Sequence, residues 1–253
     1  MAGNDAWMEI LAPRQNLMIK EKVNLIEAAS ALMGTEIEMG NKYAVKDKDT
    51  GESLFYAAES TDCCTRQCQT VCPDCAPWNL DIMLAYNGEN RKVFKMEKEW
   101  SLACCCFNRP SVTIFDVDAG TETGAVRQPC TLCGNLKFEV DDPEGNEILE
   151  ANGSCCQLGL CLPLPCGPCS EVHFDISDSD SGEPRGSMTK SVPGCLKFLF
   201  ASDVDNYEIN FFESWSPRDK ALMVALAIFM DFRLFNTNRN ADGDTDPTDF
   251  GAE

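Results

Sequence analysis

The sequence predicts a mainly β fold, a barrel or sandwich, that encloses one apolar helix near its C-terminal end. Between residues 41 and 212, many short segments alternate apolar and polar side chains and are bounded by Gly, Pro, Asn or Asp. This pattern is typical of strands with one buried and one solvated face, and turns about every ten residues are typical of all-β domains. Residues 221–230 break the alternation, because this run is apolar on every side.

Residues 1–40 are expected to form an N-terminal segment that is only partly packed. Residues 23–33, which stop before Gly34, fit a short helix nearly as well as a strand. The two alternatives stay open at this point.

The strand pattern is clearest in residues 136–140, 172–176 and 207–211, where every second side chain is apolar. Asn87-Gly88 suits a tight hairpin turn, because both residues tolerate positive φ. The other expected strands cover residues 43–46, 54–57, 80–86, 91–96, 112–117 and 196–200.

A helix is predicted over residues 217–235. Ser216-Pro217 is a favourable start, since Pro in the first turn loses no hydrogen bond. A helix that is apolar all round is surrounded either by protein or by lipid. A bilayer core needs about 20 apolar residues, and the run before Asp231 is about half as long. We therefore expect the strands to enclose it, with a transmembrane segment as the alternative. Residues 237–253 are expected to be an acidic, mobile tail.

Composition excludes several classes of protein. The chain has 253 residues, 44% of them hydrophobic, and a formal net charge of -20, so it has ample material for a core and repels nucleic-acid phosphates. No basic start followed by an apolar run marks a secretory signal, so a location in the cytosol or on the cytosolic face of a membrane is expected. In that compartment the 16 cysteines are expected to be metal ligands, acylation sites or buried thiols rather than disulfides.

One ten-residue run resembles the signature of the phospholipid scramblase family: Ala57-Ala58-Glu59-Ser60-Thr61-Asp62-Cys63-Cys64-Thr65-Arg66. Further segments resemble the family in the right order, over roughly residues 17–236. They are residues 41–43, 104–106, 172–176 and 203–207, and the apolar helix from Lys220. The resemblance implies a tubby-like fold, a closed, roughly twelve-stranded barrel threaded by a C-terminal helix, here over residues 41–236.

The resemblance also implies a function. Scramblases are associated with calcium-dependent, ATP-independent, bidirectional movement of phospholipids between bilayer leaflets. The expected location is the cytoplasmic face of a membrane, most simply the plasma membrane. The alternative is an acyl-tethered lipid-binding or adaptor module that moves no lipid and has protein partners. His173 is the single histidine, and no phosphate loop or nucleophile elbow is present, so we expect no enzyme.

The triple cysteine Cys104, Cys105 and Cys106 matches the acylated cluster of the family, although the family pattern continues with a Pro and two more cysteines. A chain of charge -20 is repelled by an anionic leaflet and needs an anchor or a bridging cation. Two or three palmitoyl chains hold a protein on a membrane where one does so marginally. Buried or metal-bound thiols are the alternative.

Other cysteines have the spacing of zinc ligands. Cys130 with Cys133, and Cys166 with Cys169, each form a C-x-x-C pair, and four thiolates satisfy a tetrahedral zinc ion. A second set of four comprises Cys64, Cys68, Cys72 and Cys75. Zinc is therefore an alternative for these residues.

The resemblance places a calcium-binding segment at Asp203, Asp205, Tyr207, Ile209 and Phe211. Its twelfth position, acidic in the family, is Ser214 here, which is expected to weaken binding. Residues 207–211 fit an ordinary strand equally well. A rival calcium loop runs from Asn238 to Asp249, although a solvated acidic tail explains it more simply.

Overall fold

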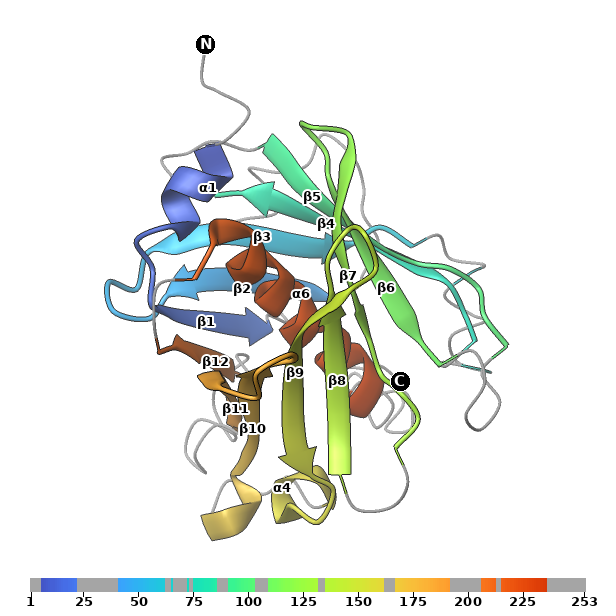
Figure 1. Ribbon diagram of the computed structural model, residues 1–253. Helices are drawn as coiled ribbons and strands as arrows, with labels where there is room; N and C mark the ends of the chain where they lie inside the picture. The colour runs from blue at the N-terminus through green and yellow to red at the C-terminus, as the bar shows by residue number, and fades with distance from the viewer. Residues whose placement is uncertain are drawn as a thin grey trace, which may run out of the picture.

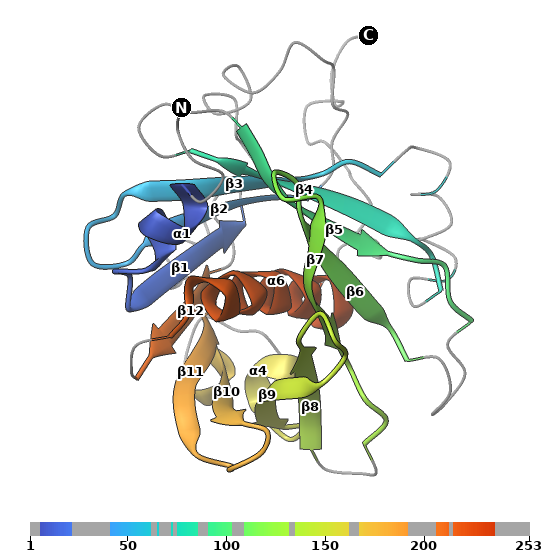
Figure 2. The same cartoon turned by 45° about the horizontal axis from the view of Figure 1, so that its top comes forward.

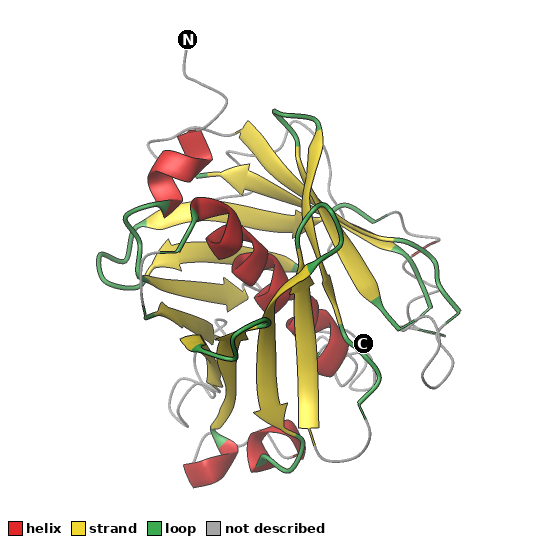
Figure 3. Ribbon diagram, viewed as in Figure 1, coloured by secondary structure: helices red, strands yellow, loops and turns green. Residues whose placement is uncertain are grey.

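Twelve antiparallel strands form a closed barrel around a long helix (Figure 1). The computed structural model describes residues 6–21, 41–61, 65, 72, 75–85, 91–102, 109–131, 135–161, 167–191, 206–212 and 215–235. Each strand pairs with its neighbours in the sequence, and β1 closes the barrel against β12. The predicted fold class is thereby confirmed, and Figure 3 shows the helix, in red, among the strands, in yellow.

The strands are β1 (Asn16–Glu21), β2 (Lys42–Asp47), β3 (Ser53–Glu59), β4 (Trp78–Leu84), β5 (Arg91–Lys98), β6 (Ser111–Asp116), β7 (Thr121–Arg127), β8 (Asn135–Asp141), β9 (Glu147–Ser154), β10 (Glu171–Asp178), β11 (Pro184–Ser191) and β12 (Asn206–Phe211). The helices are α1 (Ala6–Leu11), α4 (Leu158–Cys161), the short 3-10 turn η2 (Gly167–Cys169) and α6 (Pro217–Leu234).

Eight of the expected strands coincide with or overlap strands of the barrel. The expected strand at 196–200 and the segment 23–33 lie outside the described residues. Sequence reasoning missed β1, β7, β9 and β11. In β11 the reason is visible, because its inward positions are Gly186, Met188 and Lys190, of which only one is a large apolar side chain.

Helix α6 occupies the interior of the barrel (Figure 2). Its N-cap is Ser216, whose hydroxyl oxygen accepts a hydrogen bond from the Asp219 amide, and Pro217 follows as expected. Every residue from 220 to 231 is buried, which confirms that protein encloses the helix. In the described part of the chain, no helix has the length and apolarity needed to cross a bilayer.

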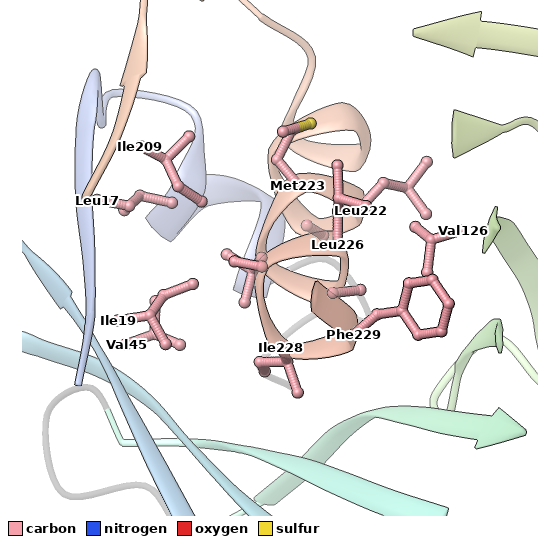
Figure 4. Packing of buried hydrophobic residues seen from close by; sticks show 14 of the residues in the cluster. Leu17, Ile19, Val45, Val126, Ile209, Leu222, Met223, Leu226, Ile228 and Phe229 are labelled. Carbon is pink, nitrogen blue, oxygen red and sulfur yellow. The ribbon is translucent and has the colours of Figure 1, made fainter. Parts of the chain in front are cut away.

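The core forms between α6 and the inner faces of the strands (Figure 4). Leu222 and Phe229 of the helix point toward Val126 on one wall, while Leu17 and Ile209 approach from the opposite wall. All five side chains are fully or almost fully buried. Since the helix turns apolar side chains in every direction, it fills the barrel as its apolar run predicts.

The alternating strand directions give the barrel two different ends. The first, which we call the turn end, has short connections at residues 47–52, 116–120, 141–146 and 178–183. Helix α6 also begins at this end. At the second, which we call the cysteine end, five connections join β3 to β4, β5 to β6, β7 to β8, β9 to β10 and β11 to β12. In this order, they comprise residues 60–77, 99–110, 128–134, 155–170 and 192–205. All 16 cysteines of the sequence belong to these five connections.

Helix α1 covers the turn end beside the start of α6. Trp7 and Leu11 are buried, and the Trp7 indole Nε1 donates to Asp116 Oδ2 over 3.1 Å. The Lys220 ammonium donates to the backbone oxygens of Leu11, Ala12 and Arg14, and burial lowers the pKa of this lysine. These bonds fasten the first turn of α6 to the N-terminal segment.

Candidate functional site

A buried polar network joins the end of α6 to the barrel wall near the cysteine end. Asp231 is 0% exposed, although the helix around it is apolar. Its Oδ1 accepts from Lys190 Nζ at 2.8 Å and from the Tyr207 hydroxyl at 2.9 Å. Its Oδ2 accepts from the Tyr43 hydroxyl at 2.8 Å. Three strands, β2, β11 and β12, therefore bind one carboxylate of the helix.

Aromatic rings complete the surroundings of the buried lysine. Lys190 Nζ lies 3.5 Å from the ring centroid of Phe235 and 4.9 Å from that of Tyr207. A buried ion pair is stable only when hydrogen bonds and neighbouring groups satisfy both charges, and this one meets that condition. We interpret the network as the fastening that keeps the last turn of α6 inside the barrel.

The expected calcium segment is only partly described. The side chains of Tyr207, Ile209 and Phe211 are buried and face the barrel interior. Strand β12 is paired with β1 on one side and β11 on the other. Its backbone carbonyls therefore point toward the strands with which β12 is paired, as in an ordinary sheet. The described residues of this segment thus fit the ordinary-strand alternative. Asp203 and Asp205 lie outside the described residues, and calcium binding there stays a prediction.

Of the expected acylation cluster and the first zinc set, the structure describes two members, Cys130 and Cys169. Cys104, Cys105, Cys106, Cys133 and Cys166 lie outside the described residues. Cys130 is disulfide-bonded, and Cys169 is a thiol on η2. Within the described ranges, no group of three or more potential metal ligands is gathered. Acylation and zinc binding therefore stay predictions.

Two cysteines of the second possible zinc set form a disulfide instead. Cys72 is bonded to Cys75. This differs from the expectation of reduced thiols throughout, which followed from the expected compartment and not from geometry. Only two residues lie between them in the sequence, and the Cys75 amide donates to the Cys72 carbonyl at 3.1 Å, which keeps the two residues close together.

The turn end carries a repeated acidic turn that sequence reasoning did not single out. Asp47, Asp116 and Asp178 each begin an Asp-x-Asp turn in which a glycine four residues later donates its amide to the first aspartate's carbonyl. These glycines have φ of 74°, 66° and 69°, a conformation that other residues adopt at a cost. The motif is readable in the sequence, because its three copies have the same spacing.

In two of these turns, interactions of the first aspartate lower its pKa. Burial raises the pKa of Asp47, but bonds from Asp49 and Thr50 and the charge of Arg14 outweigh it and lower that pKa overall. The Ser181 amide and hydroxyl lower the pKa of Asp178. In the neighbouring turn, the Asn146 side chain and amide do the same for Asp142.

A loss of stability in acid is expected from these shifts. Each folded-state pKa lies below its ordinary value of 3.8, so the contribution is present above that pH and is lost as the pH falls through the folded value. The urea midpoint of unfolding should be lower at pH 3 than at pH 6. In the triple variant Asp47→Asn, Asp142→Asn, Asp178→Asn, the fall should be smaller. An equal fall in the parent and the variant would contradict this assignment.

A family assignment follows from comparison with known proteins. The Scramblase family model matches residues 1–237. The chain belongs to the Scramblase family. It is 29% identical to phospholipid scramblase 2 of Bos taurus, over 92% of this chain and 72% of that protein. It is 27% identical to phospholipid scramblase 1 of Mus musculus, over 93% of this chain and 65% of that protein. It is also 27% identical to phospholipid scramblase 1 of Homo sapiens, over 91% of this chain and 66% of that protein.

The scramblase match covers the whole barrel and α6. This chain spans about two thirds of the length of the mouse and human proteins. No solved structure matches the chain. The family resemblance carried by residues 57–66 is confirmed, and it extends across every described element.

Proposed function

We propose that this protein moves phospholipids between the leaflets of a membrane, promoted by calcium and without ATP. The observation that carries the proposal is the family match over residues 1–237, together with relatives that are named phospholipid scramblases. Movement of lipid makes and breaks no covalent bond, so we class the protein as a non-enzyme.

The filled barrel constrains how lipid moves. Leu222, Leu226 and Phe229 are 0% exposed, and α6 packs against strands from opposite walls. A phospholipid headgroup carries charges whose transfer into such an apolar interior is strongly unfavourable. We therefore place the lipid path on the outside of the barrel, where the protein perturbs the bilayer, and not through its centre.

Calcium is the proposed cofactor because of the charge balance. The chain carries 41 acidic and 21 basic side chains, so a divalent cation that bridges carboxylates and anionic headgroups offsets their repulsion. Asp203 and Asp205 are the proposed ligands. Palmitoylation of Cys104, Cys105 and Cys106 supplies the lasting attachment, with the cytoplasmic face of the plasma membrane as the proposed location.

Reconstitution into liposomes tests the proposal. Vesicles with a fluorescent phospholipid in both leaflets are treated with a membrane-impermeant reductant, which bleaches only the outer leaflet. With protein and calcium, we expect bleaching beyond the half reached in protein-free vesicles. Asp203→Asn with Asp205→Asn should raise the calcium concentration required, whereas Asp49→Asn at the turn end should not.

The second candidate is a tethered lipid-binding or adaptor module, which the filled barrel favours. Equal bleaching in protein-free and protein-loaded vesicles, with and without calcium, would establish this candidate over lipid movement. Replacing Cys104, Cys105 and Cys106 by serine is expected to lower membrane partition of the protein made in eukaryotic cells under either function. Unchanged partition would remove the acylation proposal.

A further inference from the structure

Among the residues that the structure describes, three large apolar side chains are exposed at the cysteine end. Trp100 is 64% exposed and Leu102 is 59% exposed, and both follow β5. Leu158, in the connection that follows β9, is 53% exposed, and the exposed thiols of Cys155 and Cys156 lie three and two residues before it. Single exposed apolar residues are common on soluble proteins. Here, however, they occur in the connections that also contain the cysteines.

Trp100 stands on a fixed part of the backbone. The Lys98 ammonium, two residues earlier, is buried and donates to the Ala76 carbonyl at 2.7 Å. The Ser101 amide donates to the Cys75 carbonyl at 3.1 Å. These bonds attach the end of β5 to the neighbouring β3–β4 connection. The backbone on both sides of Trp100 is therefore held in place before a partner binds, which reduces the ordering that binding requires.

The opposite end has the wrong charge for a membrane. Its four short turns carry eleven acidic side chains and one lysine: Asp47, Asp49, Glu52, Asp116, Asp118, Asp141, Asp142, Glu144, Asp178, Asp180 and Glu183, with Lys48. An anionic leaflet repels this end. By sequence, the five connections named for the cysteine end carry five acidic and three basic side chains, a lower density of acidic charge, and they include the exposed Trp100, Leu102 and Leu158.

We propose that Trp100 and Leu102 form a docking surface that enters the headgroup layer of a phospholipid bilayer and orients the barrel with its cysteine end, which also carries Leu158, toward the membrane. Tryptophan suits this layer because it has an apolar body and a polar N–H. The proposal rests on the proposed function and specifies its partner surface. It also places the cysteine connections beside the membrane, where acylation requires them.

The tryptophans of the chain make this testable by fluorescence. The sequence has four, and Trp7, Trp78 and Trp215 are at most 4% exposed. Trp100 is therefore the tryptophan that a quencher in lipid reaches first. Unacylated full-length protein is titrated with vesicles of phosphatidylcholine brominated on its acyl chains. Quenching is expected in the parent chain and should vanish in Trp100→Phe.

Binding is measured in parallel by vesicle sedimentation. Trp100→Ser with Leu102→Ser is expected to weaken partition about tenfold, from the apolar area no longer buried. Phe212 is 57% exposed at the turn end, so Phe212→Ser is the matched control and should leave partition unchanged. Thermal unfolding establishes that both variants are folded.

Two outcomes overturn the proposal: no quenching of Trp100 at lipid concentrations that sediment the protein, or an equal loss of binding in Phe212→Ser. The outcome of the lipid-movement assay is separate. Quenching of Trp100 without lipid movement would contradict the proposed function but would support the docking surface. Lipid movement without quenching of Trp100 would support the proposed function but would contradict the docking surface.

Discussion

Asp231→Ala is expected to lower the free energy of unfolding by about 3–5 kcal/mol, because it removes one half of a buried ion pair. Lys190 is 3% exposed and would be left in the interior without its carboxylate partner. The hydroxyls of Tyr43 and Tyr207 would lose their acceptor at the same time. Chemical denaturation of the purified chain measures the effect.

Two further variants separate charge from packing. Tyr43→Phe removes one hydrogen bond and keeps the ring, so a loss of about 1 kcal/mol is expected. Asp231→Ala combined with Lys190→Met removes both charges and should be less destabilising than the sum of the two single variants. A loss below about 1 kcal/mol for Asp231→Ala would show that the network does not fasten the helix.

Phe229→Ala is expected to cost about 3–5 kcal/mol, because it opens a cavity between α6 and the barrel wall. Phe229 is 0% exposed, and its ring meets the Phe138 ring edge-on at a centroid distance of 6.0 Å. Thermal and denaturant unfolding in detergent-free buffer measure the loss.

Arg218→Ala is the matched control for Phe229, since Arg218 is an exposed residue of the same helix. Its replacement should change stability by no more than about 0.5 kcal/mol. If Phe229→Ala changed stability equally little, the helix would not be packed inside the barrel in solution.

The enclosed helix was predictable because the sequence signals for it lie within the helix segment itself. An uninterrupted apolar run shorter than a bilayer span, with a Ser-Pro start, leaves a protein interior as its natural environment. The clear strands were also predictable, since Val172, Phe174 and Ile176 alternate with polar residues. Strands such as β7 were not, because Thr123 and Gly124 occupy buried positions where large apolar side chains would mark a strand. The strand number came from the family resemblance.

The buried network shows the limit of sequence reasoning. An aspartate within an apolar helix indicates a buried partner, but the chain has 21 lysines and arginines. Choosing Lys190 requires the register of β11 with β12, where Lys190 lies opposite Tyr207. Tyr43 joins from 188 positions away in the sequence. Such contacts are fixed by barrel closure and not by any local pattern.

Hydrogen–deuterium exchange of the full chain in detergent-free buffer tests the enclosure of α6 most directly. The amides of residues 221–231 are expected to be among the slowest to exchange, with no change when phosphatidylcholine vesicles are added. Exchange of these amides within seconds in buffer, with protection gained only in the presence of vesicles, would contradict an enclosed helix.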